Sequence, residues 1–258
     1  MLLCVDIGNT QTAVGLFRAQ QLLARWAFST CASDTADEIA LRLTGLLALE
    51  SLTCDDIDAA CIACVVPSLT ESWRTAALRI ASVAPIVVGP GVKTGLAMRY
   101  DNPAEIGADR VADAVAALDA FGAPVVVVDL GTATNIEVID CDGAFAGGII
   151  APGLGTSAAD LASHAARLPM VDLSFPAHAV GTNTADAMRS GLMWGEVARI
   201  DGLVRLVFSE LGYEAPVIAT GGFANVIAGL CTSVTRHEPD LTLAGLRIIY
   251  ERNTRTCA

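Results

Sequence analysis

Two short segments of the chain combine an aspartate, a glycine and threonines at the end of an apolar run. The first is Asp6-Ile-Gly8-Asn-Thr10-Gln-Thr12, and the second is Asp129-Leu-Gly131-Thr132-Ala-Thr134. Glycine lets the backbone bend with positive φ and bring N–H groups close to phosphate oxygens, and threonine hydroxyls add further donors. Two aspartates beside a bound phosphate are natural ligands for Mg²⁺ and other cations. These residue types predict that both segments bind phosphate groups.

The spacing of these segments indicates an internal repeat. Asp129 follows Asp6 by 123 residues, close to half of the 258-residue chain. One such segment is compatible with an ordinary β-turn, whereas two copies at this separation indicate a duplicated domain. A further glycine pair, Gly221-Gly222, follows the apolar run 217–220. It is compatible with a flat seat for a planar base or with a tight strand-to-helix turn.

The segment from Tyr100 to Arg110 carries the residues that could act on a hydroxyl group. Pro103 disfavours helix at the residue before it, and Gly107 allows a sharp approach, so Asp109 and Arg110 lie near the start of a helix. Asp109 could stabilise that helix start, or it could take the proton of a hydroxyl that receives a phosphoryl group. The Arg110 guanidinium suits carboxylate or phosphate oxygens.

The elements that must position these residues repeat as well. In each half the aspartate segment joins two apolar strands of a predicted three-stranded antiparallel meander. Helical patterns follow, the first over 35–49 with Asp34 or Thr35 as N-cap. A later strand closes each half, 59–66 in the first and 215–220 in the second. Two α/β lobes with mixed sheets are expected, with a ligand cleft between them.

Composition restricts the partners and the location. The net charge of −12 and the absence of a basic cluster disfavour nucleic acid. Apolar runs stay shorter than the roughly 18 residues that a membrane helix needs, and Met1 to Val5 lacks the basic flank of a signal peptide. Eight cysteines without framework spacing predict reduced thiols, and Cys61-x-x-Cys64 reads as a buried strand rather than a redox or zinc motif. We therefore expect a cytoplasmic protein.

Taken together, these motifs resemble type III pantothenate kinases, within the actin, Hsp70 and sugar-kinase superfamily. The strings that carry the resemblance span nearly the whole chain in order: 6–10, 100–103, 107–110, 129–134, 147–153, 181–184 and 240–247. The resemblance implies an α/β fold of duplicated ribonuclease H-like (actin-like) lobes. Each lobe would hold a mixed five-stranded sheet flanked by helices, with the ATP cleft between them. The predicted lobes are residues 1–118 and 119–258.

The resemblance also implies an activity and a set of site residues. The activity is phosphorylation of pantothenate to 4′-phosphopantothenate by ATP with Mg²⁺, the first step of coenzyme A biosynthesis, with Asp109 as general base. Asp129 would hold a monovalent cation, K⁺ or NH₄⁺, and Asp6 would hold Mg²⁺ through phosphate. Residues implied for ATP are Asp6, Ile7, Gly8, Asn9, Thr10, Gln11, Thr12, Ala13 and Thr132. Residues implied for pantothenate are Tyr100, Gly107, Ala108, Asp109 and Arg110, with Thr184 supplied by the neighbouring subunit of a homodimer.

Two further readings stay open at the level of the sequence. One is a nucleotide-gated binding or regulatory protein with the same lobes, and the other is a kinase for another small hydroxylated substrate such as a sugar. Asp109 with Arg110 and Tyr100 favours a kinase over a pure switch. Three positions depart from the family pattern: Asn135, Glu137 and Thr182. They affect the expected affinity or cation preference rather than the reaction class.

Overall fold

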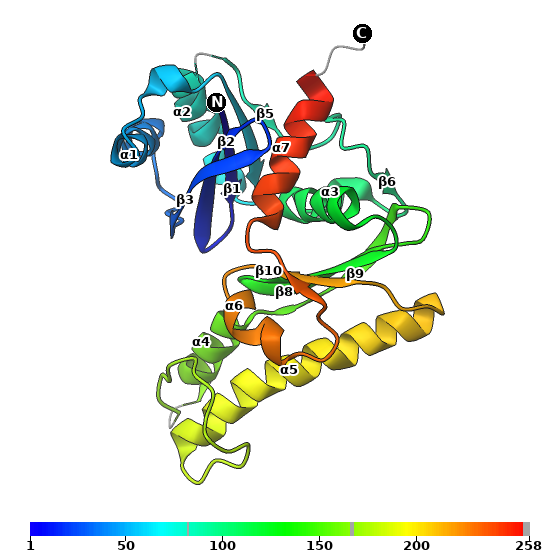
Figure 1. Cartoon of the computed structure of the whole chain (residues 1–258). Coiled ribbons are helices and arrows are strands. Elements are labelled where there is room, and N and C mark those ends of the chain that lie inside the picture. Colours follow the sequence, from blue (N-terminus) through cyan, green and yellow to red (C-terminus); the bar gives the residue numbers. More distant parts are fainter. Residues whose placement is uncertain (82, 166–167, 255–258) are drawn as a thin grey trace. The chain divides into compact units, whose positions relative to one another are not determined.

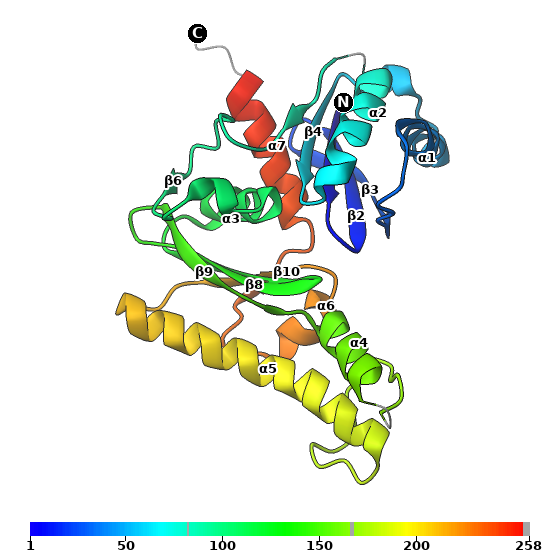
Figure 2. The ribbon, with the colours of Figure 1, turned by 180° about the vertical axis from the view of Figure 1, so that it is seen from behind.

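The computed structural model describes residues 1–81, 83–165 and 168–254, and it divides into two compact units. The first unit comprises residues 1–119 together with 240–258, and the second comprises residues 120–239 (Figures 1 and 2). The sequence repeat places the lobe boundary after residue 118 and assigns the C-terminal segment to the second lobe. In the structure that segment packs on the strands of the first unit.

The first unit is built on a five-stranded mixed sheet of order β3-β2-β1-β4-β5. The strands are β1 (Leu2–Ile7), β2 (Gln11–Arg18), β3 (Gln21–Ser29), β4 (Ala59–Cys64) and β5 (Ile86–Val87). The meander β1-β2-β3 is antiparallel, whereas β4 and β5 run parallel to β1. The unit also contains α1 (Ala36–Leu49), α2 (Thr70–Ala81), β6 (Ala97–Met98), α3 (Ala108–Phe121, of which residues 120–121 fall in the second unit) and α7 (Leu241–Thr254).

The two faces of this sheet are covered by different helices. Alternate residues of β1, namely Leu3, Val5 and Ile7, are buried in one core with α1 and α2. Helix α7 contacts β1, β2 and β4 and lies on the opposite side of the sheet from α1 and α2 (Figures 1 and 2). Cys4 between them is buried as well, and it lies on the other face because successive side chains of a pleated strand alternate between the two faces.

The second unit repeats the same topology. Its own strands have the order β11-β10-β7-β8-β9, with an antiparallel meander β7-β8-β9 and with β10 and β11 parallel to β7. The bounds are β7 (Val125–Leu130), β8 (Ala133–Ile139), β9 (Ala144–Pro152), β10 (Val217–Thr220) and β11 (Arg236–His237). Both predicted meanders and both closing strands are confirmed.

Three helices pack with one face of the second sheet: α4 (Leu154–His164), α5 (Thr184–Leu211) and α6 (Ala224–Ile227). Helix α5 is longer than its apolar pattern over 185–200 indicates. It begins after the Asn183 cap and ends at Gly212, whose left-handed φ of 77° terminates it. Seven of its apolar residues belong to the core: Met188, Leu192, Met193, Val197, Ile200, Val204 and Val207. Trp194 is instead 37% exposed.

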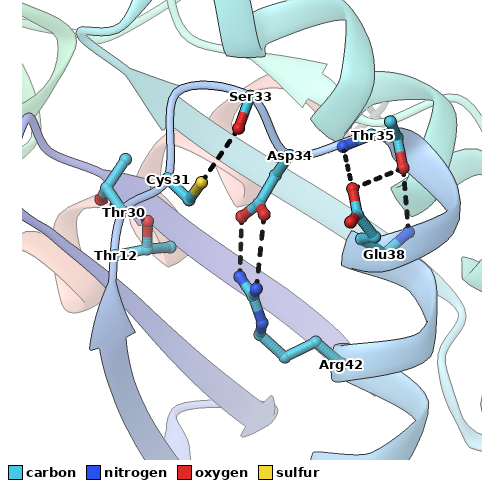
Figure 3. Close-up of polar contacts among 8 residues, drawn as sticks. All are labelled: Thr12, Thr30, Cys31, Ser33, Asp34, Thr35, Glu38 and Arg42. Carbon is cyan, nitrogen blue, oxygen red and sulfur yellow. Dashed lines mark hydrogen bonds and ion pairs between the residues drawn. The ribbon is translucent and has the colours of Figure 1, made fainter.

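The start of α1 shows how local sequence sets an element boundary. The Thr35 side chain accepts a hydrogen bond from the Glu38 backbone N–H, and the Glu38 carboxylate accepts one from the Thr35 N–H (Figure 3). This reciprocal capping confirms the predicted helix start. Beside it, Asp34 forms an ion pair with Arg42 at 2.8 Å.

The structure tests the predictions that the cysteines are reduced and that no helix spans a membrane. Cys61 and Cys64 lie in β4, and every cysteine among residues 1–254 has a free thiol, as predicted; Cys257 lies outside the described residues. Burial raises the pKa of Cys61 to about 12, which makes its thiol inert. Within the described ranges, no helix combines the length and apolar character that crossing a membrane requires.

Candidate functional site

A pocket of about 650 Å³ lies in the first unit, where α3 begins. We call it the α3 pocket. Its walls come from the end of β4, the glycine-rich loop after β5, and the segment that leads into α3. The lining residues are Cys64, Val65, Pro67, Val88, Gly89, Pro90, Gly91, Val92, Thr94, Met98, Pro103, Ala104, Glu105, Ile106, Gly107, Ala108 and Val111. Two predicted substrate residues, Gly107 and Ala108, thus face a cavity of the size that holds small ligands.

Asp109 follows these lining residues in the first turn of α3. Its Oδ1 accepts a hydrogen bond from the Arg110 backbone N–H at 2.8 Å. Burial raises the pKa of Asp109, although the Arg110 N–H and the Arg110 charge both act to lower it. A carboxylate with a raised pKa is a stronger base than an exposed aspartate, because its affinity for a proton is closer to neutral pH.

Gly107 has a steric reason to be glycine. A Cβ atom at this position would lie 2.4 Å from Asp109 Oδ1, a separation that real Cβ atoms do not show. The bare backbone of Gly107 therefore lets the Asp109 carboxylate occupy its present place. Of the other predicted substrate residues, Arg110 is 6% exposed and Tyr100 is half-buried.

The first aspartate hairpin joins β1 to β2 at residues 8–11, which lie between the paired residues Ile7 and Thr12. Its end is closed by the Gly8 N–H, which donates to the Gln11 carbonyl at 3.0 Å. A Cβ at Gly8 would lie 2.9 Å from that same carbonyl, so the turn requires glycine here. Asn9, Thr10 and Gln11 are exposed at the tip.

Two of the residues predicted to bind ATP in this hairpin point inward. Ile7 is fully buried, and Thr12 is 1% exposed with its hydroxyl 2.8 Å from that of Thr30 (Figure 3). Thr30 also donates its N–H to the Thr10 carbonyl. Sequence alone does not show that Thr12 supports the turn from within, because a threonine near a turn can face either side of the sheet.

The second hairpin joins β7 to β8 through a turn that is one residue shorter. The register shows this, because Leu130 pairs with Thr134 whereas Ile7 pairs with Thr12. Thr132 is exposed at its tip, and its carbonyl accepts hydrogen bonds from the Gly153 N–H at 3.1 Å and the Thr156 hydroxyl at 2.7 Å. The start of α4 therefore fixes this turn.

Sequence reasoning assigned no role to Gly153 or Thr156. A Cβ at Gly153 would lie 2.4 Å from the Gly131 carbonyl oxygen, so only glycine permits this packing. In the sequence, the glycine directly after Pro152 is the one residue that could have indicated this close backbone contact.

The third glycine motif packs directly on Asp129. Gly221 has a φ of +91°, and a Cβ there would lie 2.3 Å from Asp129 Oδ1. The Phe223 N–H donates to the Leu130 carbonyl at 3.1 Å, which closes the turn over the end of β7. The Asp129 carboxylate therefore lies against the backbone of Gly221.

A buried ionic network connects the second hairpin to α5. The hydroxyl of Thr134, which is 1% exposed, donates to Glu196 Oε1 at 2.7 Å. Glu196 pairs with Arg199, which also donates to Thr134 Oγ1 at 3.3 Å and to the Pro152 carbonyl at 2.7 Å. Thr12 and Thr134 hold equivalent register positions in the two units. Thr12 is hydrogen-bonded to the neutral hydroxyl of Thr30, whereas Thr134 is hydrogen-bonded to the carboxylate of Glu196.

The structure also locates the residues expected to bind cations and to reach a neighbouring subunit. Among residues 1–81, 83–165 and 168–254, no three histidine, cysteine or acidic side chains gather into a metal site. Thr184 is exposed at the first turn of α5. Two of the three residues that depart from the family pattern, Asn135 and Glu137, are buried in β8, at 8% and 0% exposure. The third, Thr182, is exposed.

Comparison with known proteins gives a consistent family. A model of the type III pantothenate kinase family matches residues 2–206. The type III pantothenate kinase of Acidobacterium capsulatum is 43% identical over 257 residues, which cover 97% of this chain and 94% of that protein. The type III pantothenate kinase of Thermomicrobium roseum is 44% identical over 256 residues, with 99% of each chain covered.

Solved structures with low sequence identity share the fold. A protein described as a Baf family transcriptional activator from Campylobacter jejuni superposes with a TM-score of 0.62 at 19% identity, covering 98% of this chain and 100% of that one. A protein described as an N-acetylmannosamine kinase from Listeria monocytogenes gives a TM-score of 0.53 at 11% identity, covering 98% and 99%. At these identities the likeness shows the actin-like fold alone.

Proposed function

Because the chain belongs to the type III pantothenate kinase family, we propose that Asp109 is the general base of its reaction. The family activity is the ATP-dependent phosphorylation of pantothenate, the first step of coenzyme A biosynthesis. The observation that carries the proposal is the position of Asp109. Its carboxylate, with a pKa raised by burial, follows directly on the residues that line the α3 pocket.

The proposed chemistry uses this carboxylate once in each turnover. Asp109 accepts the proton of the pantothenate hydroxyl as the hydroxyl oxygen forms a bond to the γ-phosphorus of ATP. The bond from that phosphorus to the bridging oxygen breaks, and ADP leaves. Arg110, beside the base, is suited to the substrate carboxylate or to the phosphoryl oxygens because its guanidinium donates in a fork.

Replacement of Asp109 by Asn tests the base directly. Asn keeps the size of the side chain and removes the proton acceptor, so kcat should fall by about 10²- to 10⁴-fold with the fold intact. Asp160→Asn, an exposed aspartate of α4, is the matched control and should keep wild-type turnover. The assay is acceptor-dependent ADP release with circular dichroism on each variant. Near wild-type kcat for Asp109→Asn would refute the assignment.

For ATP we propose binding by residues 6–13 of the first hairpin and by Thr132 of the second. The exposed tips Asn9–Gln11 and Thr132, each locked by backbone hydrogen bonds, support this because phosphate binding needs fixed N–H donors. Side chains of Ile7 and Thr12 are buried, so their part is structural or through the backbone. Mg²⁺ that arrives with ATP neutralises phosphate charge when bound, and the Asp6 carboxylate is the proposed partner.

A monovalent cation at Asp129 is the remaining ligand proposal. The carboxylate lies against the backbone of Gly221, so it could share a hard cation with carbonyl oxygens. Asp129→Asn should raise the K⁺ or NH₄⁺ concentration needed for half-maximal activity at constant ionic strength. An unchanged requirement would remove Asp129 from the cation site. The cytoplasm stays our proposed location, because the reaction consumes ATP.

The surface of α5 supports the proposed homodimer. A Cβ added to Gly191, Gly195 or Gly202 would meet nothing within 4 Å, and Ala198 is exposed between them. Glycine inside a helix costs about 0.5–1 kcal/mol relative to Ala, and packing within this chain does not require it. These four small residues would be explained by close packing of a helix from a second subunit, since small side chains let two helix backbones come near.

Subunit mixing tests both the dimer and the role of Thr184. Asp109→Asn and Thr184→Arg should each be inactive alone, the second because a large side chain blocks the partner's pocket. In mixed dimers one site keeps both Asp109 and the partner's Thr184, so about a quarter of wild-type activity returns at statistical exchange. No recovery, despite exchange of subunits shown by sedimentation or labelled chains, would refute the shared site.

A further inference from the structure

The loop between β5 and β6 forms one wall of the α3 pocket and has little internal support. Residues 88–92 and Thr94 line the pocket, and no helix or strand is assigned to the loop between Val87 and Ala97. Glycines at 91 and 95 adopt φ of +91° and +67°. Within the loop, the Val92 N–H donates to Gly89 and the Leu96 N–H to the Thr94 hydroxyl. A segment with so few bonds of its own needs outside contacts to keep one shape.

The last turn of α7 supplies such contacts from 160 residues away. Asn253 Oδ1 accepts a hydrogen bond from the Lys93 N–H at 3.0 Å, and Asn253 Nδ2 donates to the Lys93 carbonyl at 2.9 Å. One amide side chain thus satisfies both backbone groups of Lys93. The same Nδ2 also donates to the Ile249 carbonyl at 2.8 Å, which fixes the side chain to its own helix.

Arg252 completes the contact one residue earlier. Its Nη1 donates to the Thr94 carbonyl, so backbone groups of two successive loop residues are bound by α7. A Cβ at Gly95 would lie 2.7 Å from this Nη1, and the left-handed backbone there also favours glycine. The positive φ is what favours glycine at this position, and the absence of a side chain leaves room for the guanidinium.

The other end of α7 contacts α3, which also contributes to the lining of the pocket. The Thr242 hydroxyl donates to Asp113 Oδ1 of α3 at 2.6 Å. A Cβ at Gly245 would lie 1.9 Å from the Ala112 carbonyl, so the two helices are in backbone contact. Helix α7 thereby contacts both α3, which carries Asp109, and the loop before β6 (Figure 1).

We propose that Asn253 and Arg252 are positioning residues for the acceptor pocket. They bind the backbone of Lys93 and Thr94 and keep the loop closed as a wall against which pantothenate binds. The proposal rests on the proposed function in that the α3 pocket is taken as the pantothenate site. Loss of the Asn253 amide removes two hydrogen bonds to the loop, which should raise its open population on the order of 10- to 30-fold.

The sequence provides a direct probe of loop opening, because Lys93 is the only lysine in the chain. An endoproteinase that cuts after lysine has one possible site, and cleavage there requires the loop to leave α7. Asn253→Ala should be cut on the order of tenfold faster than wild type at low protease concentration. Thr254→Ala is the matched control, since the Thr254 hydroxyl donates to the Tyr250 carbonyl of its own helix. Its cleavage rate should equal that of wild type.

Kinetics then separate positioning from mere folding. In Asn253→Ala the KM for pantothenate should rise, by at most the factor that applies to the open-to-closed ratio, because KM scales with the inverse of the closed fraction. The kcat and the KM for ATP should stay within twofold. Arg252→Met provides a second variant with the same expected pattern if Asn253→Ala folds poorly. Thermal unfolding of each variant checks that cleavage occurs from a folded protein.

Each outcome decides a different point. Unchanged cleavage of both variants would refute the contact as a restraint on the loop. Faster cleavage with an unchanged KM for pantothenate would refute the positioning role. Saturating pantothenate should slow cleavage of the wild type at Lys93. If it gives no protection while Asn253→Ala is still cut faster, the loop restraint holds and the assignment of the α3 pocket to pantothenate fails.

Discussion

Gly107→Ala is the substitution whose effect on catalysis can be worked most directly from the structure. The added Cβ would lie 2.4 Å from Asp109 Oδ1, and ordinary contacts begin near 3.4 Å. The carboxylate must therefore move by about 1 Å, and a displacement of this size costs roughly 10²-fold in rate when it misplaces a reacting group. We expect kcat to fall by about 10²-fold, with the KM for ATP unchanged.

The controls distinguish a displaced base from a damaged fold. Gly45→Ala adds a methyl to an exposed position of α1 where nothing lies within 4 Å, and it should leave kcat unchanged. In the double variant Gly107→Ala with Asp109→Asn, the two losses should not add, because both act through one carboxylate. Steady-state kinetics with pantothenate and thermal unfolding are measured for wild type, Gly45→Ala, the two single variants Gly107→Ala and Asp109→Asn, and the double variant. A kcat for Gly107→Ala within threefold of wild type would refute the steric argument, and so would full additivity in the double variant.

The remaining predictions concern acid dependence and the two buried threonines. Because burial raises the pKa of Asp109, activity should disappear as the pH falls through a value above 3.8, which the acid limb of kcat/KM measures. Burial also acts to raise the pKa of Asp201, but hydrogen bonds from Ser233 and Thr232 outweigh it and hold this pKa at about 2. This depressed pKa stabilises the fold above about pH 4, and the stabilisation is lost as the pH falls from 4 to 2. Because solvent screens this partly exposed carboxylate, Asp201→Asn should remove about 1 kcal/mol at neutral pH, as urea unfolding across pH would show. Thr134→Val should lower the free energy of unfolding by about 1.5–3 kcal/mol, because Thr134 donates to the Glu196 carboxylate. Thr12→Val should lower it by about 1 kcal/mol, because the partner of Thr12 is the neutral Thr30 hydroxyl. Equal losses in urea unfolding would contradict a stronger hydrogen bond to the carboxylate.

The elements with a local signature could be predicted from the sequence. The repeated aspartate hairpins gave the right meanders in both units, because the apolar runs and turn residues that specify them are contiguous. The start of α1 at the Thr35 cap was likewise predictable from a residue that binds its own helix end. The segment 100–110 correctly indicated a turn that leads into α3.

Long-range contacts had no such signature. Nothing local shows that α7 packs on β1, or that Asn253 binds Lys93, since both depend on segments more than 150 residues apart. The orientation of Thr134 was equally hidden, because its partner Glu196 lies 62 residues further along the chain. Glycines were the best available signal of such close contacts: Gly153 and Gly245 each mark a place where the backbone of another segment comes too close for a side chain.

The discontinuity of the first unit has a consequence for synthesis on the ribosome. The chain leaves this unit after Asp119 and returns only at Asp240, so α7 is made after the whole of the second unit. The second unit is continuous and can fold while translation proceeds, because domains fold as they emerge. The first unit must wait, with one face of β1, β2 and β4 uncovered, until its last helix is released. The first unit is therefore the part of the nascent chain that most needs chaperone protection, because its apolar sheet face stays exposed although this unit is synthesised first.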